Sequence, residues 1–459
     1  MDTKNELKIF EEKVKDIFFY CCRYGVYTFF KGQASTDNFD GRELNRICFD
    51  GFKIAQKKIV TELRLIQTTI KKNQEEIKQA RRDKNKPLED ELIKAESLLN
   101  YQSDIFKNLA DSIAWQLLNG QHYLYRRLYT HETGEKDLND KSFDFVLDFA
   151  EKINENPDSM CLVTDITNNI QLGDCLVVDS EGIKISEIKS GETNFKALEV
   201  IKKEALNEEN YNETELKKSF DDKFVKQVKR MVSQQAKTDR AAKIIENNQG
   251  ADPKYPDATV RIVENDFQIE TYHSTLIKLI NQLEDKDWAY DCVEAVVHIG
   301  VYKNDWRIYG QFSIQQLCNP FPLTDLMSGR GTMICEPIFL KPLTDQQVLD
   351  IVLGRIKIYI GIDIEKLIEF ANHLGIKASW SSSKELHKLF SNKSYNSKEI
   401  FSFENKGIKL NINGQDNFLG QGFLGKIIFD HFLPSTMLLK YQQQTSSEND
   451  NTATEEKPS

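Results

Sequence analysis

Residues 173–191 read GDCLVVDSEGIKISEIKSG, and this stretch decides the expected fold. Two short apolar runs, 175–178 and 183–188, are rich in β-branched residues. Between them lies a cluster of turn formers at 179–182. The pattern predicts a β-hairpin.

The turn also predicts which residues face each other across the two strands. If Asp179 pairs with Gly182, counting back along both strands puts Asp174 opposite Glu187, with Cβ atoms roughly 5 Å apart. Lys189 lies two residues beyond Glu187 and therefore projects from the same face. Because isolated buried charges are unfavourable, such a trio indicates either a metal site or an ion-pair network.

Two interpretations of this trio remain open. Hard cations such as Mg²⁺ bind carboxylate oxygens, and a lysine beside them can position or deprotonate a water and offset charge on a phosphate. Alternatively, the end of the hairpin is solvated and carries a surface ion pair. The E-x-K pattern also occurs elsewhere in this lysine-rich chain, for example at Glu76 and Lys78 on a predicted helix.

The spacing Asp-x12-Glu-x-Lys on a hairpin resembles the PD-(D/E)XK nuclease superfamily, which has the restriction-endonuclease-like fold. The family motif maps onto Asp174, Glu187 and Lys189, with Gly173 where the family usually has proline. The resemblance implies a nuclease that uses Mg²⁺ or Mn²⁺ to hydrolyse phosphodiester bonds, with DNA preferred over RNA. It implies that Asp174, Glu187 and the carbonyl of Ile188 bind the metal and that Lys189 orients the attacking water.

The resemblance also implies further site residues. The helix that opens the family core often supplies an extra acidic residue, for which Asp148 and Glu151 in the predicted helix 141–154 are candidates. Asp165 in the predicted strand 161–166 is another, and the sequence does not choose among them. The helix after the E-x-K strand often carries a glutamine facing the metal, which here is Gln227, with Gln234 as the alternative.

The predicted helical stretch 196–247 is basic in its second half. Phosphate contacts from lysine and arginine dominate the affinity of proteins for nucleic acid, so this helix is the expected backbone-binding surface. An exposed helix of mixed charge is the alternative. The residues assigned to nucleic-acid binding are Lys223, Lys226, Lys229 and Arg230.

The predicted fold class is α/β in the mixed α+β sense, with four segments. Residues 1–130 form a helical domain with helices at 5–31, 42–82 and 88–119, the last two being an antiparallel hairpin with a basic tip. Residues 131–305 form the nuclease-like domain, and the β-branched strand 294–302 is expected in the same sheet as the hairpin. Residues 306–440 form a C-terminal α/β domain, and the polar residues 441–459 are expected to be disordered.

Within the C-terminal domain, strands are predicted at 334–339 and 356–362, a helix at 364–376, a helix or a loop at 344–352, and a hairpin at 399–412. The run GQGFLGK at 420–426 matches GxGxxG and GxxxxGK, but Ile427 replaces the Ser or Thr of a P-loop. No strand is predicted directly before it, so both nucleotide-binding interpretations are disfavoured. His298, alone in an apolar strand, is interpreted as a core residue.

Composition narrows the functional classes. A net charge of −10 argues against a protein that coats nucleic acid through bulk charge. The eight cysteines include no CxxC pair, which indicates reduced thiols in a cytoplasmic protein. The polar start and the lack of an apolar run of 18 residues predict neither a signal peptide nor a membrane span.

The expected function is therefore a metal-dependent nuclease. By analogy of architecture, the accessory domains suggest the effector of a microbial defence system, with a protein partner or a second copy bound through the helical hairpin or the C-terminal domain. The competing interpretation is a non-catalytic nucleic-acid-binding or scaffold subunit with a degenerate nuclease core.

Overall fold

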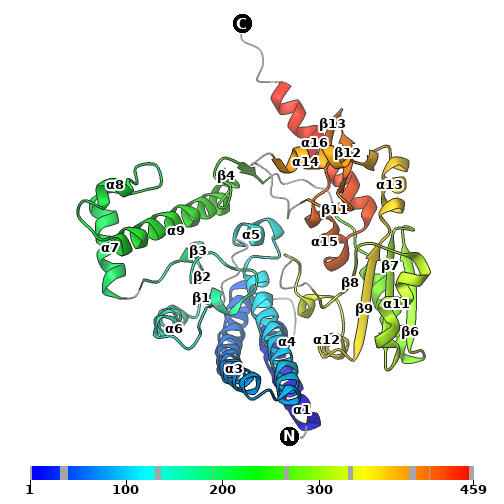
Figure 1. Ribbon diagram of the computed structural model, residues 1–459, viewed down its shortest axis with the longest axis horizontal. Helices are drawn as coiled ribbons and strands as arrows, with labels where there is room; N and C mark the ends of the chain where they lie inside the picture. Colours follow the sequence, from blue (N-terminus) through cyan, green and yellow to red (C-terminus); the bar gives the residue numbers. More distant parts are fainter. Residues whose placement is uncertain are drawn as a thin grey trace. The chain divides into compact units, whose positions relative to one another are not determined.

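The chain folds into two compact units, each described here by itself (Figure 1). The computed structural model describes residues 3–31, 40–129, 136–189, 191–262, 268–328, 334–391, 400–412 and 414–453. Unit 1 comprises Met1–Glu264 with Pro337–Leu340, and unit 2 comprises Asn265–Glu336 with Lys341–Ser459. Helices combine with small antiparallel sheets in a mixed α+β structure, as predicted. The division falls at 264, well before the boundary expected at 305.

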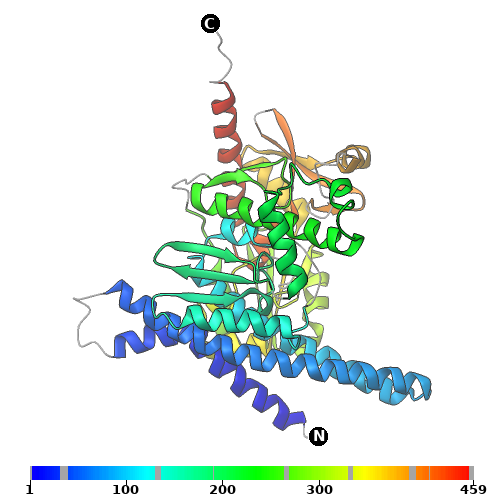
Figure 2. The ribbon, with the colours of Figure 1, turned by 90° about the vertical axis from the view of Figure 1, so that its left-hand side faces the viewer.

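Unit 1 begins with a helical layer close to the predicted one. Asp40 caps α3 by accepting from the backbone N–H groups of the first turn, and Asn85 caps α4 in the same way. The two helices run side by side as an antiparallel arm (Figure 2). The helices are α1 (Thr3–Cys22), α2 (Tyr24–Lys31), α3 (Gly41–Arg82) and α4 (Lys86–Leu117).

The interior of the arm and its tip differ in part from expectation. Leu63 and Ile105 are buried in the interior of the arm, whereas Leu98 is 51% exposed. At the tip, Arg81 and Lys86 both pair with Glu89, at 2.8 and 3.2 Å. These ion pairs neutralise part of the positive charge that the sequence places at the tip.

A three-stranded antiparallel sheet follows, in the order β1-β2-β3. All four residues of β1 are buried, and α6 and α3 pack against this strand. The predicted first strand is shorter than expected, because its last residues form a 3₁₀ turn that contains Asp165. The elements are α5 (His122–Arg127), α6 (Lys141–Asn154), β1 (Met160–Val163), η1 (Thr164–Ile166), β2 (Cys175–Asp179) and β3 (Gly182–Ser186).

Three helices and a small strand pair complete unit 1. Ala197 of α7 and Val228 of α9 belong to one buried apolar cluster, so the two helices pack together. The stretch after α9 contains a two-stranded antiparallel sheet. The elements are α7 (Glu192–Lys203), α8 (Glu213–Leu216), α9 (Asp222–Asn247), β4 (Gln249–Ala251) and β5 (Thr259–Arg261).

Unit 2 contains an antiparallel sheet in the order β6-β7-β9-β8. The expectation that the strand near 294–302 joins the hairpin sheet is wrong, because β7 pairs with β6 and β9. A β-branched run indicates a buried strand but does not identify its partner. Helix α11, which the sequence analysis did not predict, packs on β7 and β9. The elements are α10 (His273–Asn281), η2 (Gln282–Glu284), β6 (Trp288–Val293), β7 (Val297–Lys303), α11 (Trp306–Cys318), β8 (Leu323–Asp325) and β9 (Ile356–Ile362).

The rest of the chain corrects two more expectations. Residues 338–340 form the 3₁₀ turn η4 instead of part of a strand, and residues 441–453 are helical instead of disordered. The elements are η4 (Ile338–Leu340), α12 (Asp345–Val352), α13 (Ile364–His373), β10 (Lys377–Trp380), α14 (Ser383–Ser391), β11 (Ser402–Phe403), β12 (Lys406–Ile412), β13 (Gln415–Phe418), α15 (Gln421–Phe429) and α16 (Pro434–Ala453). Residues 454–459 of the expected disordered tail lie outside the described residues.

Two further expectations concern the chain as a whole. All eight cysteines are free thiols. Among the described helices, none is both long enough and apolar enough to cross a membrane.

Candidate acidic site at the end of the hairpin

The register predicted from the turn is confirmed. Asp179 pairs with Gly182, and the ladder continues to the pair Cys175 and Ser186. One residue further, the backbone N–H of Asp174 donates to the carbonyl of Ser186 at 2.8 Å. Asp174 and Glu187 directly follow the last pair of the ladder, so both lie at the open end of the hairpin.

Gly173 stands where the resembled family usually has proline, and the backbone there does not admit proline. Its φ is +77°, a conformation that proline cannot adopt because its ring holds φ near −65°. A Cβ atom at this position would lie 2.4 Å from Cγ2 of Ile185 and 3.2 Å from the carbonyl oxygen of Ser186. Only glycine fits here without displacing the second strand of the hairpin.

The carboxylate of Asp174 is held from two sides. One oxygen accepts the backbone N–H of Ile188 at 2.7 Å, and the other accepts the ammonium of Lys136 at 3.1 Å. Lys136 also pairs with Asp165, 2.7 Å away, so its ammonium bridges two carboxylates. The side chains of Asp165 and Asp174 are only 10% and 15% exposed. This bridge brings residues from three segments to one place.

The electrostatics show that the carboxylates lie close together. Burial raises the pKa of Asp165, and this outweighs the opposite effect of Lys136. The negative charges of Asp174 and Glu187 raise the pKa of Asp165 further. Burial by itself would lower the pKa of Lys136, but the two carboxylates that it bridges raise it well above its usual value. The site is thus a cluster of three acidic groups with a lysine bound to two of them.

Lys189 completes the cluster. Its ammonium donates to Glu187 at 2.8 Å and to the side-chain oxygen of Gln234 at 3.1 Å. Gln227, the glutamine first expected in this role, instead donates to the side chain of Asn194 at 2.5 Å. The alternative, Gln234, is therefore the glutamine at the site, two helical turns further along α9.

The structure also distinguishes the three candidates for the extra acidic residue. Asp165 lies in the cluster, whereas Asp148 is exposed on α6. Glu151, on the same helix, pairs with Lys57 at 3.1 Å on the surface. Lys136 is a site residue that was not predicted, because it lies in a polar stretch with no motif around it.

The oxygen atoms of the acidic cluster fit a metal ion in type but not in arrangement. The carboxylate oxygens and the carbonyl of Ile188 are the ligand types that Mg²⁺ and Mn²⁺ prefer. Their arrangement, however, holds a lysine: the Lys136 ammonium lies between Asp165 and Asp174. Within the described part of the chain, no group of three or more His, Cys, Asp or Glu side chains is placed to hold a metal ion.

The residues assigned to nucleic-acid binding lie on α9. Arg230 is four residues before Gln234 and so projects from the same helical face, one turn from the site. Lys229 pairs with Glu213 at 3.2 Å, which neutralises part of the expected positive surface. All four assigned residues are exposed: Lys223, Lys226, Lys229 and Arg230.

Other motifs lie outside this cluster. Strand β13 ends shortly before Gly420 and α15 begins directly after it, so the expectation that no strand precedes this run is wrong. Ile427 is fully buried in α15, where a P-loop would need a hydroxyl for the metal. His298 is buried against Tyr290, whose hydroxyl lies 2.7 Å from Nδ1, in keeping with a core role. Another glycine-containing run, SGRG at 328–331, lies almost wholly outside the described residues, since residues 329–331 are not described.

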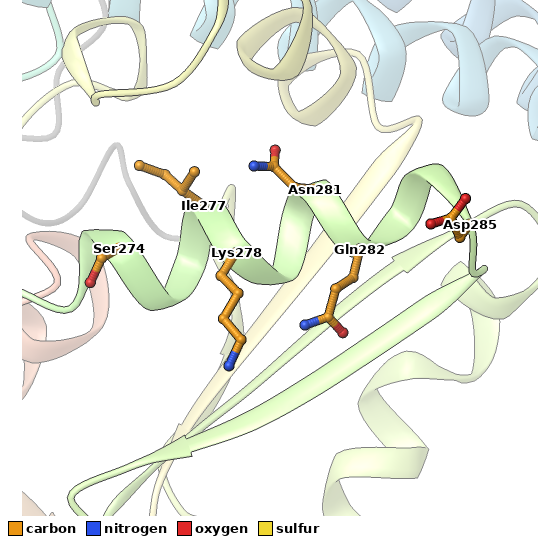
Figure 3. A pocket seen from close by; sticks show the side chains of 6 residues that line it. All are labelled: Ser274, Ile277, Lys278, Asn281, Gln282 and Asp285. Carbon is orange, nitrogen blue, oxygen red and sulfur yellow. The ribbon is translucent and has the colours of Figure 1, made fainter.

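Two surface grooves lie away from the acidic cluster. One, of about 590 Å³, follows α10, where the side chains of Lys278 and Gln282 point to one side of the helix (Figure 3). The other, of about 650 Å³, lies at the turn of the hairpin, between Gly182 and Phe52 of α3. Neither groove is lined by the acidic cluster, which lies at the opposite end of the hairpin.

Comparison with known proteins gives no relative. The chain matches no protein family model, no curated protein sequence and no solved structure.

Proposed function

We propose that unit 1 is a metal-dependent nuclease that hydrolyses phosphodiester bonds of DNA, with RNA as the alternative substrate. The observation that carries the proposal is the meeting of Asp174, Glu187 and Lys189 at one end of the hairpin. Asp165 and Gln234 join them from two other elements. A chance E-x-K pattern would not be expected to gather these extra residues.

Each residue has a distinct role in the proposal. In this proposal Asp165, Asp174 and Glu187, together with the carbonyl of Ile188, would hold Mg²⁺ or Mn²⁺ once the carboxylates leave their lysine partners. When bound, the metal supplies charge neutralisation at the phosphate and lowers the pKa of a water. Lys189 is fixed between Glu187 and Gln234, so its ammonium is oriented to position the attacking water and to stabilise charge on the phosphate.

The order of elements in unit 1 supports a restriction-endonuclease-like core. A helix, a strand, a hairpin and then helices follow one another, as α6, β1, β2–β3 and α7–α9. The sheet contains only these three strands in the part of the chain that the structure describes. The proposal therefore rests on the site and on this local order of elements.

One observation favours a second candidate, a non-catalytic subunit with a degenerate nuclease core. Each of the three carboxylates is paired with a lysine, as expected of an ion-pair network that only stabilises the fold. The two candidates differ in their response to metal. A ligand that binds only the folded state stabilises it by about 2.7 kcal/mol when its concentration is 100 times its dissociation constant. Mn²⁺ should therefore raise the melting temperature if the protein is a nuclease, and leave it unchanged if the protein is a non-catalytic subunit.

The cellular role is a further part of the proposal. The helical arm and unit 2 are accessory to the site, an architecture that supports a defence effector regulated by a partner or by self-association. We propose a cytoplasmic location, which the free thiols support.

The decisive experiment is a cleavage assay on the full chain. Plasmid DNA, single-stranded DNA and RNA are incubated with Mg²⁺, Mn²⁺ or EDTA, beside the variants Glu187→Gln and Lys189→Met. We expect metal-dependent cleavage that falls by about 100-fold or more in both variants. Lys184→Met is the matched control, because Lys184 lies on the same hairpin at its opposite end and should not affect cleavage. Wild-type rates in Glu187→Gln would refute the site.

A further inference from the structure

The ammonium of Lys136 lies where a cation would be expected at the acidic site. It is 2.7 Å from Oδ1 of Asp165 and 3.1 Å from Oδ1 of Asp174. Both carboxylates are nearly buried, and charge-assisted hydrogen bonds of this kind are the stronger ones in proteins. Any metal held by these oxygens has to displace this ammonium.

The backbone around Lys136 is anchored, but its side chain has room to move. Gln67 of α3 donates to the carbonyl of Lys136 at 2.9 Å and accepts from the N–H of Leu138 at 2.8 Å. The side chain of Lys136 is 56% exposed, so its ammonium can leave the carboxylates for water while the backbone stays in place. The segment before α6, anchored to α3 by Gln67, therefore carries a tethered cation that can enter and leave the site.

We infer that Lys136 is an internal competitor for the metal and keeps the site in a resting state. This inference rests on the proposed function, because it assumes that Asp165 and Asp174 bind a divalent cation. A lysine carries one charge and Mn²⁺ carries two, so sufficient metal displaces it. Binding of nucleic acid also favours displacement, because a phosphate attracts the released ammonium.

The test measures metal binding instead of cleavage. Titration calorimetry with Mn²⁺ on the full chain compares wild type with Lys136→Met, which removes the charge but keeps the length, and Lys136→Arg, which keeps the charge. We expect Lys136→Met to bind Mn²⁺ at least about tenfold more tightly than wild type, with Lys136→Arg close to wild type. Asp174→Asn should abolish the binding in each background, which assigns the heat to this site.

The outcomes distinguish failure of the competitor inference from failure of the nuclease proposal. Equal Mn²⁺ affinity in wild type and Lys136→Met overturns the competitor and leaves the nuclease proposal intact. Weaker binding in Lys136→Met shows that Lys136 assists the metal and also overturns the inference. No Mn²⁺ binding in any variant overturns the metal site and, with it, both proposals. Melting curves without metal confirm that each variant is folded.

An independent observation concerns α11 in unit 2. One side of this helix packs on the sheet, where a Cβ on Gly310 would lie 2.7 Å from Tyr302 and 2.8 Å from Tyr359. The opposite side is apolar and open: Ile308 is 79% exposed and Phe312 is 65% exposed. Their spacing of four residues puts them next to each other on one helical face. Four aromatic side chains of this region are about half exposed: Trp288, Trp306, Tyr309 and Phe312.

The size and charge of this face indicate what covers it. The residues that share this face, Ile308, Tyr309 and Phe312, together present roughly 400 Å², which is at the scale of functional patches on single proteins. This is about half of what one partner contributes to a standard interface. Arg307 is the only charged residue of α11, and it donates to the carbonyls of Asn304 and Gly354. Each chain has a net charge of −10, but this face has no free charge of its own. Two copies can therefore meet through it without like charges coming into contact.

We infer that α11 forms the contact between two copies of this chain, with the two helices antiparallel about a two-fold axis. Sedimentation analysis of the full chain over a concentration series should show a dimer. Phe312→Asp should weaken association at least about tenfold, because a central aromatic anchor is replaced by a charge. Leu98→Asp, an exposed apolar position on the arm, is the matched control and should leave the dimer intact.

Two results would overturn this second inference. The first is a wild-type chain that stays monomeric at every concentration, which would leave α11 to a different occupant. The second is dissociation by Leu98→Asp without dissociation by Phe312→Asp, which would place the contact on the arm. Circular dichroism checks that both variants keep their helices.

Discussion

Replacing Gly173 by alanine tests the geometry that places Asp174. The φ of +77° costs an L-residue about 1–2 kcal/mol. The added Cβ would lie 2.4 Å from Cγ2 of Ile185, and such overpacking costs about 1–3 kcal/mol more. We therefore expect Gly173→Ala to destabilise the hairpin by about 2–5 kcal/mol.

The assay has to report on the hairpin itself, because a chain with two compact units need not unfold in one step. Native-state hydrogen exchange at the amides of β2 and β3 gives the free energy of local opening. Gly182→Ala is the matched control, because Gly182 belongs to the same hairpin and has a φ of +115° but no heavy atom within 4 Å of a Cβ. Gly182→Ala should therefore show only the free-energy cost of a positive φ, without the cost of overpacking.

A double-mutant cycle separates the two contributions. Adding Ile185→Ala to Gly173→Ala removes the atom that clashes and should recover the overpacking part of the loss. The reasoning is refuted if Gly173→Ala costs no more than Gly182→Ala. It is refuted equally if Ile185→Ala recovers nothing in the Gly173→Ala background.

Three further predictions follow from single contacts. Gln234→Ala should lower cleavage about tenfold, the value of one lost hydrogen bond to Lys189, and Gln227→Ala should change it little, which single-turnover rates will show. Burial raises the pKa of Asp111 to about 6, so the folded state binds this proton more tightly than the unfolded state. The free energy of unfolding should therefore fall by about 2 kcal/mol as pH rises from 4 to 6, and Asp111→Asn should flatten that part of a urea-unfolding series. Arg127→Ala should cost about 3–5 kcal/mol, measured by hydrogen exchange at the amides of β4 and β5, because it removes the ion-pair partner of the nearly buried carboxylate of Asp252; a loss below 1 kcal/mol would contradict this.

The site shows where prediction from sequence succeeded. The two apolar runs and the turn formers at 179–182 predicted the hairpin register, and this register leads Asp174 and Glu187 to the same open end of the hairpin. The same kind of local signal set the ends of α3 and α4, where capping residues and a break in the apolar pattern coincide. These features depend on residues close to one another in the chain.

The rest of the site depends on contacts between distant segments. Which glutamine reaches Lys189 depends on how far α9 is shifted along the hairpin, and this shift is set by the packing of α7 against α9. Nothing in the sequence favoured Asp165 over Asp148 or Glu151. In the structure, the 3₁₀ turn after β1 places Asp165 beside Asp174, where both carboxylates bind Lys136. Lys136 carried no sequence signal, because its two partners are 29 and 38 residues away in the chain.

Strand partners and chain ends show the same limit. The sequence by itself determined that residues near 297–303 form a buried strand, but only the tertiary structure decided that this strand pairs with β6 and β9. The polar composition after residue 441 predicted disorder, yet α16 continues to Ala453 from an apolar start that is buried in unit 2. Local pattern determines which elements form and which faces they bury, because it acts through neighbouring residues. Partner choice and the lysine-bound state of the acidic site are set by free energies of packing and charge pairing between segments that meet only in the folded chain.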